Sequence, residues 1–141
     1  MLAFKAELLD GQLLRTIGHA SYGGAELGEC LATAKTIDPR DRDSWMRAWC
    51  ELADRTFAEA ETCRDAVGAR CGFLRASSYY RNAYVLHLEV PLPDAARDAY
   101  RKHRDAFRRA SVAEPIDLDG SHWGCCEPST THVYCGPCLQ S

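Results

Sequence analysis

The sequence contains no lysine or arginine after Arg109, although 17 basic residues precede that point. Residues 112 to 141 instead carry four acidic residues and four of the eight cysteines. Two kinds of sequence are therefore joined near residue 112. We predict a helical domain over residues 1–111 and an irregular, cysteine-rich tail over residues 112–141, either disordered or read out of frame.

Long apolar runs are also missing. No run approaches the ~18 apolar residues that a membrane-spanning helix needs. Lys5, Glu7 and Asp10 interrupt the N-terminal stretch, where a signal peptide would need an unbroken apolar segment. The net charge of −3 gives no basic excess for nucleic acid. We expect a cytoplasmic protein with no membrane and no nucleic-acid partner.

Strand-like alternation is absent before residue 112, whereas apolar residues recur there at three- and four-residue spacing. The fold class is therefore predicted to be all-α, an array of about five antiparallel helices. The helices are expected over residues 4–17, 25–36, 44–67, 73–88 and 94–111. The sequence "GARCG" is predicted to separate the third helix from the fourth. Ala95, Ala99, Tyr100, Phe107 and Ala110 are predicted to form the apolar side of the last helix.

The sequence "CGPC" at Cys135 to Cys138 matches the dithiol of thioredoxin-type redox sites. Such a site needs a strand before the first cysteine and a helix after it, because the helix N-terminus lowers the thiol pKa. Only three residues follow Cys138. We therefore do not interpret the dithiol as a redox active site.

Zinc is an alternative for the same segment. His122 lies in this segment as well, and the ligand candidates are Cys125, Cys126, His132, Cys135 and Cys138. They exceed the four soft ligands of a tetrahedral site, but their spacing matches no familiar zinc finger or ribbon. Otherwise no metal and no cofactor is expected.

The segment "GHASYGG" comes close to Gly-x-Ser-x-Gly, the nucleophile elbow of α/β-hydrolases. Gly18 lies three residues before Ser21 rather than two, and both flanks are predicted to be helical. Ser21 is therefore interpreted as a turn residue. Further along, "RASSYYRNAYVLH" places aromatic residues with polar tips on one helix. They would either line a cleft or pack in the core with their hydroxyls at the surface.

Three segments together resemble the N-terminal helical region of a subfamily of α/β-hydrolases. They are "IGHASYGGAELGECLATAKTIDPRDRDSWMRAWCELADR", "RASSYYRNAYVL" and "YRKHRDAFRRA". The subfamily includes 2,6-dihydroxypseudooxynicotine hydrolase and the polyketide-shortening hydrolases of fungal pigment pathways. The resemblance covers about residues 4–118 and ends before "SHWGCCEPSTTHVYCGPCLQS".

The resemblance implies a helical cap over a C-terminal domain that uses a Ser-Asp-His triad to cleave carbon-carbon or ester-type bonds. No catalytic residue is expected in this chain, which we interpret as a cap region that is inactive alone. By their place in the matching segments, the candidates for lining the substrate cleft are His19, Tyr22, Trp45, Tyr79, Tyr80 and Arg81. The expected partner is the missing hydrolase domain, or a second copy bound through the exposed apolar cap face.

Two other functions stay open at this stage. One is a helical interaction module that pairs with another chain through an apolar face normally covered by the hydrolase domain. The other is a helical domain whose cysteine-rich tail binds zinc or undergoes redox chemistry.

Overall fold

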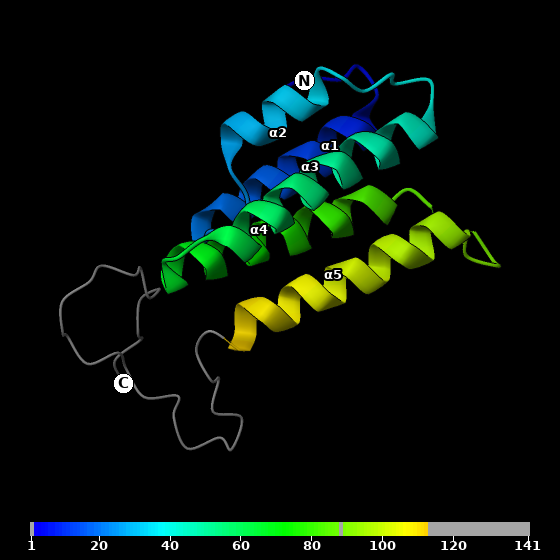
Figure 1. Cartoon of the computed structure of the whole chain (residues 1–141). Coiled ribbons are helices and arrows are strands. Elements are labelled where there is room, and N and C mark those ends of the chain that lie inside the picture. The colour runs from blue at the N-terminus through cyan, green and yellow to red at the C-terminus, as the bar shows by residue number, and fades with distance from the viewer. Residues whose placement is uncertain (1, 88, 113–141) are drawn as a thin grey trace, which may run out of the picture.

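A computed structural model describes residues 2–87 and 89–112 of the chain (Figure 1). These residues form five α-helices and one 3₁₀-helix, with no strand among them, which confirms the predicted all-α architecture. The elements are α1 (Glu7–Gly18), η1 (His19–Tyr22), α2 (Leu27–Ala34), α3 (Arg42–Thr62), α4 (Ala66–Tyr84) and α5 (Asp94–Val112).

Helix α4 is the centre of the array. It packs along α3 and along α5, and it also touches α1 (Figure 1). Helix α2 lies against α1 and α3. No helix in this described part of the chain is long and apolar enough to cross a membrane.

The core is built around a row of aromatic rings. Trp45 and Trp49 are fully buried on one face of α3, because a four-residue spacing places both on the same side of a helix. The ring centroids of Phe4 and Trp45, of Trp45 and Trp49, and of Trp49 and Tyr79 lie 5.9, 5.7 and 5.8 Å apart. Each such pair adds about 0.5–1.5 kcal/mol beyond the area it buries. The Trp45 indole N–H donates to the carbonyl oxygen of Asn82 at 2.8 Å, so the buried indole nitrogen has a hydrogen-bond partner.

The chain before α1 is fixed by one carboxylate. Asp10 accepts hydrogen bonds from the backbone N–H groups of Leu2, Ala3 and Phe4 at 2.7, 2.8 and 3.0 Å. These bonds hold the pKa of the Asp10 carboxyl well below its usual range. Phe4 is thereby held against Trp45, which anchors the N-terminal segment to the aromatic core.

The predicted boundary between the third and fourth helices is wrong. The break lies at residues 63–65, and "GARCG" is inside α4. Asp65 caps the new helix by accepting from the backbone N–H of Gly68 at 2.7 Å. Gly72 is a packing residue, because a β-carbon placed there would lie 2.7 Å from the β-carbon of Ala60 on α3. The glycine permits close helix packing instead of ending a helix.

The inner face of α5 also differs from the prediction. Its buried residues are four alanines at helical spacing: Ala96, Ala99, Ala106 and Ala110. Tyr100 and Phe107 are 42% and 51% exposed, and Ala95 is exposed as well. Small side chains let α5 lie close against α4. Tyr100 packs at the edge of this contact, with its ring centroid 5.8 Å from that of Tyr84 on α4.

Candidate functional site

A pocket of about 330 Å³ lies over α4, with α1 and η1 on one side and α5 on the other. We call it the cationic pocket after its basic residues Arg15, His19, Arg81 and His103. Its remaining lining residues are Tyr22, Leu74, Ser77, Ser78 and Phe107. None of these lining residues is acidic, so the pocket has a positive potential that favours an anion.

Two glycines after η1 place its side chains in the pocket. Gly23 has a φ of 79°, in the left-handed region that glycine adopts without strain. A β-carbon on Gly24 would lie 2.7 Å from the Tyr22 ring and 3.2 Å from the Ser78 hydroxyl oxygen. The absence of side chains at these two positions therefore lets η1 fold back against α4.

His103 is held against α4 by Ser77. The His103 Nδ1 atom lies 2.9 Å from the Ser77 hydroxyl oxygen and 3.0 Å from the Ser77 carbonyl oxygen. Burial lowers the pKa of His103, and the charge of Arg81 lowers it further, against an opposing effect of the bond to the Ser77 backbone. His103 is therefore neutral at pH 7. A proton on Nδ1 satisfies the Ser77 carbonyl group and leaves Nε2 as an acceptor.

His19 faces the same cations from η1. Burial is the largest effect lowering the pKa of His19, followed by the charges of Arg81 and Arg15. Its ring lies 5.5 Å from the Tyr22 ring at an interplanar angle of 35°. The His19 Nδ1 atom is buried and has no hydrogen-bond partner among residues 2–87 and 89–112. The described residues therefore leave the hydrogen-bonding capacity of this atom unused.

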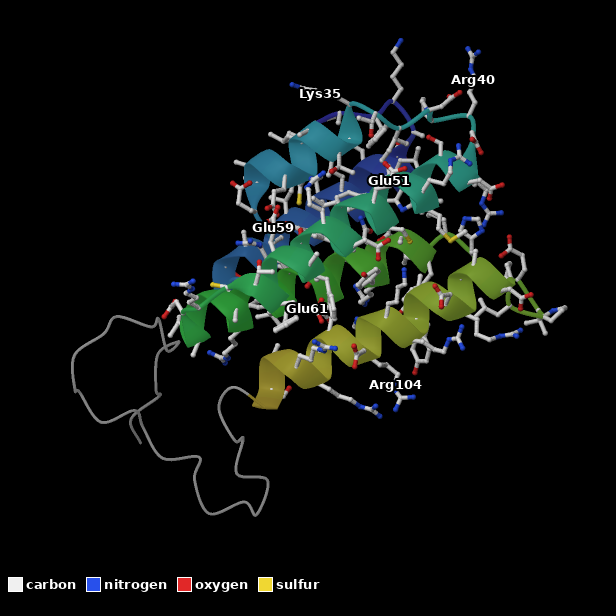
Figure 2. All side chains as sticks on the ribbon, viewed as in Figure 1. Lys35, Arg40, Glu51, Glu59, Glu61 and Arg104 are labelled. Carbon is white, nitrogen blue, oxygen red and sulfur yellow. The ribbon has the colours of Figure 1, made fainter. Side chains whose placement is uncertain are left out.

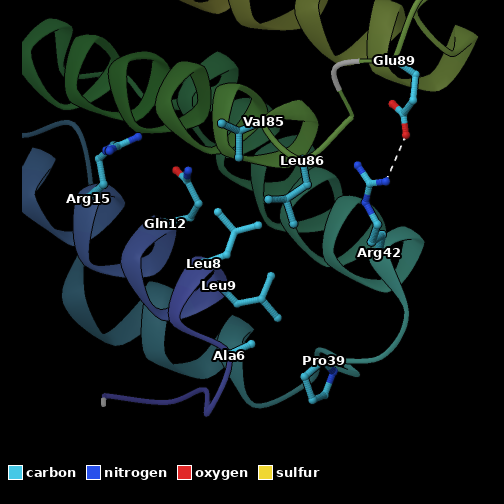
Figure 3. A pocket seen from close by; sticks show the side chains of 10 residues that line it. All are labelled: Ala6, Leu8, Leu9, Gln12, Arg15, Pro39, Arg42, Val85, Leu86 and Glu89. Atoms are coloured by element: carbon cyan, nitrogen blue, oxygen red, sulfur yellow. Dashed lines mark ion pairs between the residues drawn. The ribbon is translucent and has the colours of Figure 1, made fainter.

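A second, larger hollow adjoins the cationic pocket. It has a volume of about 820 Å³ and lies between α1 and the end of α4. We call it the apolar groove, because Leu8 and Leu9 of α1 and Val85 and Leu86 at the end of α4 gather at its centre (Figure 3). The rest of its lining is Ala6, Gln12, Arg15, Pro39, Arg42 and Glu89.

Charged residues stand at both ends of the apolar groove. Arg15 lies at one end and also lines the cationic pocket, so the two hollows share it (Figure 3). At the other end Arg42 and Glu89 form an ion pair at 3.1 Å. The apolar groove therefore has a paired arginine, Arg42, at one end and the shared residue Arg15 at the end that adjoins the cationic pocket.

The six predicted cleft residues are divided among three places. His19, Tyr22 and Arg81 meet in the cationic pocket. Trp45 and Tyr79 lie in the core, both fully buried. Tyr80 lines a separate hollow of about 360 Å³, which it shares with Asp54 and Lys102. Spacing in the sequence did not point to Arg15 or His103, which reach the pocket only because α1 and α5 both flank α4.

The buried tyrosines are tied to acidic residues. Tyr79 accepts from the backbone N–H of Glu26 at 2.8 Å and donates to the Glu29 carboxylate at 2.5 Å. Burial, followed by the hydrogen bond to Glu29, strongly raises the pKa of Tyr79. Tyr80 donates to Asp54 at 2.5 Å, and Lys102 donates to the same carboxylate oxygen at 2.9 Å. These bonds give both tyrosines a structural role among the helices.

Ser21 occupies a turn, as predicted. It lies in η1, and its hydroxyl group donates to the carbonyl oxygen of Gly18 at 3.1 Å. A nucleophile elbow needs a strand before the serine, and no strand is present in the described ranges. This serine is therefore not placed as a hydrolase nucleophile.

The helical domain contains four free cysteines: Cys30, Cys50, Cys63 and Cys71. Burial raises the pKa of Cys30 and of Cys50 to about 11, so both are unreactive thiols. Within the described part of the chain, no three His, Cys, Asp or Glu residues are grouped as a metal site would require. The proposed zinc ligands and the "CGPC" dithiol all lie outside the described residues.

Comparison with known proteins relates the chain to fungal hydrolases. It is 44% identical over 96 residues to Hydrolyase poxO of Penicillium oxalicum, covering 65% of this chain and 23% of that protein. It is 38% identical over 122 residues to Hydrolase LUC6 of a Fusarium species, covering 84% and 28%. Alpha/beta hydrolase psoB of Aspergillus fumigatus is 38% identical over 92 residues, covering 63% and 21%.

These matches confirm the resemblance to hydrolases: the chain is homologous to one region of fungal proteins with hydrolase names, and psoB among them is named an alpha/beta hydrolase. It spans about a quarter of the length of the curated relatives it matches. No protein-family profile matches the chain, and no solved structure matches it.

Proposed function

We propose that this chain supplies the helical cap of an α/β-hydrolase, and that the cationic pocket and the apolar groove form the cap's side of the substrate cleft. The observation that carries the proposal is the similarity to hydrolases over only about a quarter of their length. All elements of the described residues are helices. The reaction of an α/β-hydrolase uses a serine on a strand-to-helix turn of a sheet, so the chemistry belongs to another part of such an enzyme.

In this role the cap binds and orients the substrate and excludes water, while a Ser-Asp-His triad elsewhere hydrolyses a carbon-carbon or ester-type bond. The cap residues proposed to face the substrate are Arg15, His19, Tyr22, Arg81 and His103. Trp45, Tyr79 and Tyr80 are proposed to hold the helices that carry these residues. The expected partner is a hydrolase domain with a sheet.

The test uses the chain alone and a chimera. In the chimera, the matching 28% of Hydrolase LUC6 is replaced by the corresponding segment of this chain. We expect the chain alone to release no p-nitrophenol from p-nitrophenyl acetate above the buffer rate, and the chimera to hydrolyse the ester. Serine-dependent burst kinetics from the chain alone would contradict the proposal. A folded chimera without activity would also count against it.

The chimera also allows a test of the cleft. Arg81→Gln in the chimera should lower kcat/KM for a substrate that fills the cap side. Arg55→Gln is the matched control, because Arg55 is an exposed arginine of α3 that lines neither hollow. Equal kcat/KM values for the two variants would show that the cationic pocket is not part of the substrate cleft.

A second candidate is a helical interaction module that self-associates through exposed apolar residues. Leu8 and Leu14 on α1 are 64% and 52% exposed, and Phe107 on α5 is 51% exposed. Exposed apolar side chains drive association when they form a continuous patch. Sedimentation equilibrium at high concentration distinguishes the candidates: a dimer that Leu14→Gln dissociates supports the module, and a monomer excludes it.

A further inference from the structure

The cationic pocket and the apolar groove lie along the same two helices, α1 and α4, and share Arg15 in their linings; we call the two together the path. Leu8, near the start of α1, shares the groove with Val85, just after α4. His19, just after α1, shares the pocket with Ser78 in the second half of α4. The two helices therefore run antiparallel, and the path passes from the apolar end to the basic end through Arg15.

The basic end is built to accept an anion. Arg15 and Arg81 are both exposed, and neither has a carboxylate partner among residues 2–87 and 89–112. A guanidinium group binds an oxyanion through two parallel N–H donors. His19 and His103 line the same end and carry no negative charge, so no lining residue there opposes an anion.

The other end is built for apolar surface. Leu8 is 64% exposed, whereas Leu9 and Leu86 are buried. All three line a hollow of about 820 Å³, so apolar surface faces the solvent there. Covering such surface is favourable, because it removes apolar area from water. A purely inorganic anion would use the basic end and leave this surface uncovered.

We propose that the path binds an amphiphilic monoanion, with its oxyanion group between Arg15 and Arg81 and its apolar body along Leu8, Leu9, Val85 and Leu86. The inference deepens the proposed function by naming the class of substrate that the cap side would recognise. The binding itself needs only residues of this chain. It is therefore testable without a hydrolase domain.

The experiment titrates the full chain with octanesulfonate, whose charge is constant between pH 5 and pH 8. Binding is followed by isothermal titration calorimetry and by NMR shifts of the labelled chain. Sulfate and 1-octanol are the comparison probes, since each supplies one half of the ligand. We expect octanesulfonate to bind at least tenfold more tightly than either probe, with shifts at both Arg81 and Leu8.

Two variants separate the two ends of the path. Arg81→Gln should weaken octanesulfonate binding about tenfold or more, because a charge-assisted contact is lost. Leu8→Gln should weaken octanesulfonate several-fold and leave ethanesulfonate unchanged, because only the longer ligand reaches the groove. Arg55→Gln, the matched control, should bind like the wild type. Circular dichroism of each variant verifies that the helices are intact.

The outcomes are distinct. Equal affinity for 1-octanol and octanesulfonate, or equal binding by Arg81→Gln and Arg55→Gln, overturns the inference. Binding confined to one end, with sulfate as tight as octanesulfonate, overturns it as well. An active chimera whose cap region fails to bind octanesulfonate would leave the cap function standing and remove only the ligand class. An inactive chimera whose cap region still binds octanesulfonate would leave the ligand class standing and count against the cap function.

Discussion

Gly72 of α4 lies so close to Ala60 of α3 that a β-carbon on the glycine would be 2.7 Å from the alanine β-carbon. The nearest Ala60 atoms also include its Cα and backbone nitrogen, at 3.4 and 3.8 Å. Backbone cannot move aside as the end of a flexible side chain does. The contact between α3 and α4 therefore depends on the missing side chain.

Gly72→Ala should destabilise the chain by about 1–3 kcal/mol, despite the better helix propensity of alanine, because of overpacking. Ala60→Gly alone should cost about 1 kcal/mol. Combined with Gly72→Ala, it should recover part of the lost stability by removing the clash. Urea unfolding followed by circular dichroism measures all three. If the changes in unfolding free energy of the two single variants simply add in the double variant, Gly72 and Ala60 are not in close contact.

Gly11→Ala is the matched control for that experiment. Gly11 is an exposed residue within α1, and a β-carbon there would meet nothing within 4 Å. The substitution should stabilise the chain by about 0.5–1 kcal/mol, because alanine loses less backbone entropy in a helix. If Gly11→Ala instead destabilises the chain, helix propensity does not determine the effect of a substitution at residue 11.

Tyr79→Phe should cost about 1–3 kcal/mol of unfolding free energy. The change removes the oxygen that accepts from the Glu26 N–H and donates to Glu29, and it leaves a partly buried N–H group unpaired. Tyr22→Phe should change stability by less than about 0.5 kcal/mol, since Tyr22 is 58% exposed. Equal urea midpoints for the two variants would contradict the role of the Tyr79 hydroxyl group.

The stability of the chain should fall as pH decreases from 7.5 to 5. The folded-state pKa of His103 is lower than its ordinary value of about 6.5, so the unfolded chain binds more protons in this range. The stabilisation is complete above that ordinary value and decreases below it, toward the lowered pKa. His103→Gln should show a smaller loss between the two pH values. His19→Gln should likewise lose less stability than the wild type between these pH values, because burial also lowers the pKa of His19.

A second loss of stability is expected in acid, below the ordinary carboxyl pKa of about 3.9. The Asp10 carboxyl has a lowered pKa, so its contribution is present above that value and disappears as pH falls toward the folded-state pKa. Asp10→Asn should be less stable than the wild type at pH 6, with a difference that narrows in acid. Hydrogen exchange at Phe4 should be faster in this variant. Unchanged exchange there would contradict the anchoring role of Asp10.

Helical periodicity was enough to predict five helices, but not the contacts between them. Helical spacing groups Tyr100 and Phe107 with Ala95, Ala99 and Ala110 on one side of α5, and a hydrophobic pattern does not say which apolar residues face inward. The closely packed helix instead buries Ala96 and Ala106. Likewise, two glycines indicated a chain break, although Gly72 is needed for packing and the Asp65 cap starts the helix.

The candidate site was predictable only in part, for a related reason. His19 and Tyr22 lie in one short segment, and Arg81 lies in a second segment that resembles the same hydrolases. Arg15 lies outside the three matching segments, and His103 lies in the third, "YRKHRDAFRRA", where nothing in the local pattern marks it as a site residue. They join the site through the packing of α1 and α5 on α4, which a pattern within one helix does not encode.

The alanine face of α5 has a consequence for how that helix is positioned. Four small side chains present a smooth surface, and a smooth surface has few ridges that would fix its axial register against α4. Polar contacts at the edges of α5 set the register. Lys102 bonds Asp54 and Arg109 bonds Glu61, both on α3 (Glu61 is labelled in Figure 2), and His103 bonds Ser77 on α4. The place of Phe107 in the cationic pocket is thus encoded by polar contacts made within about one and a half helix turns of it.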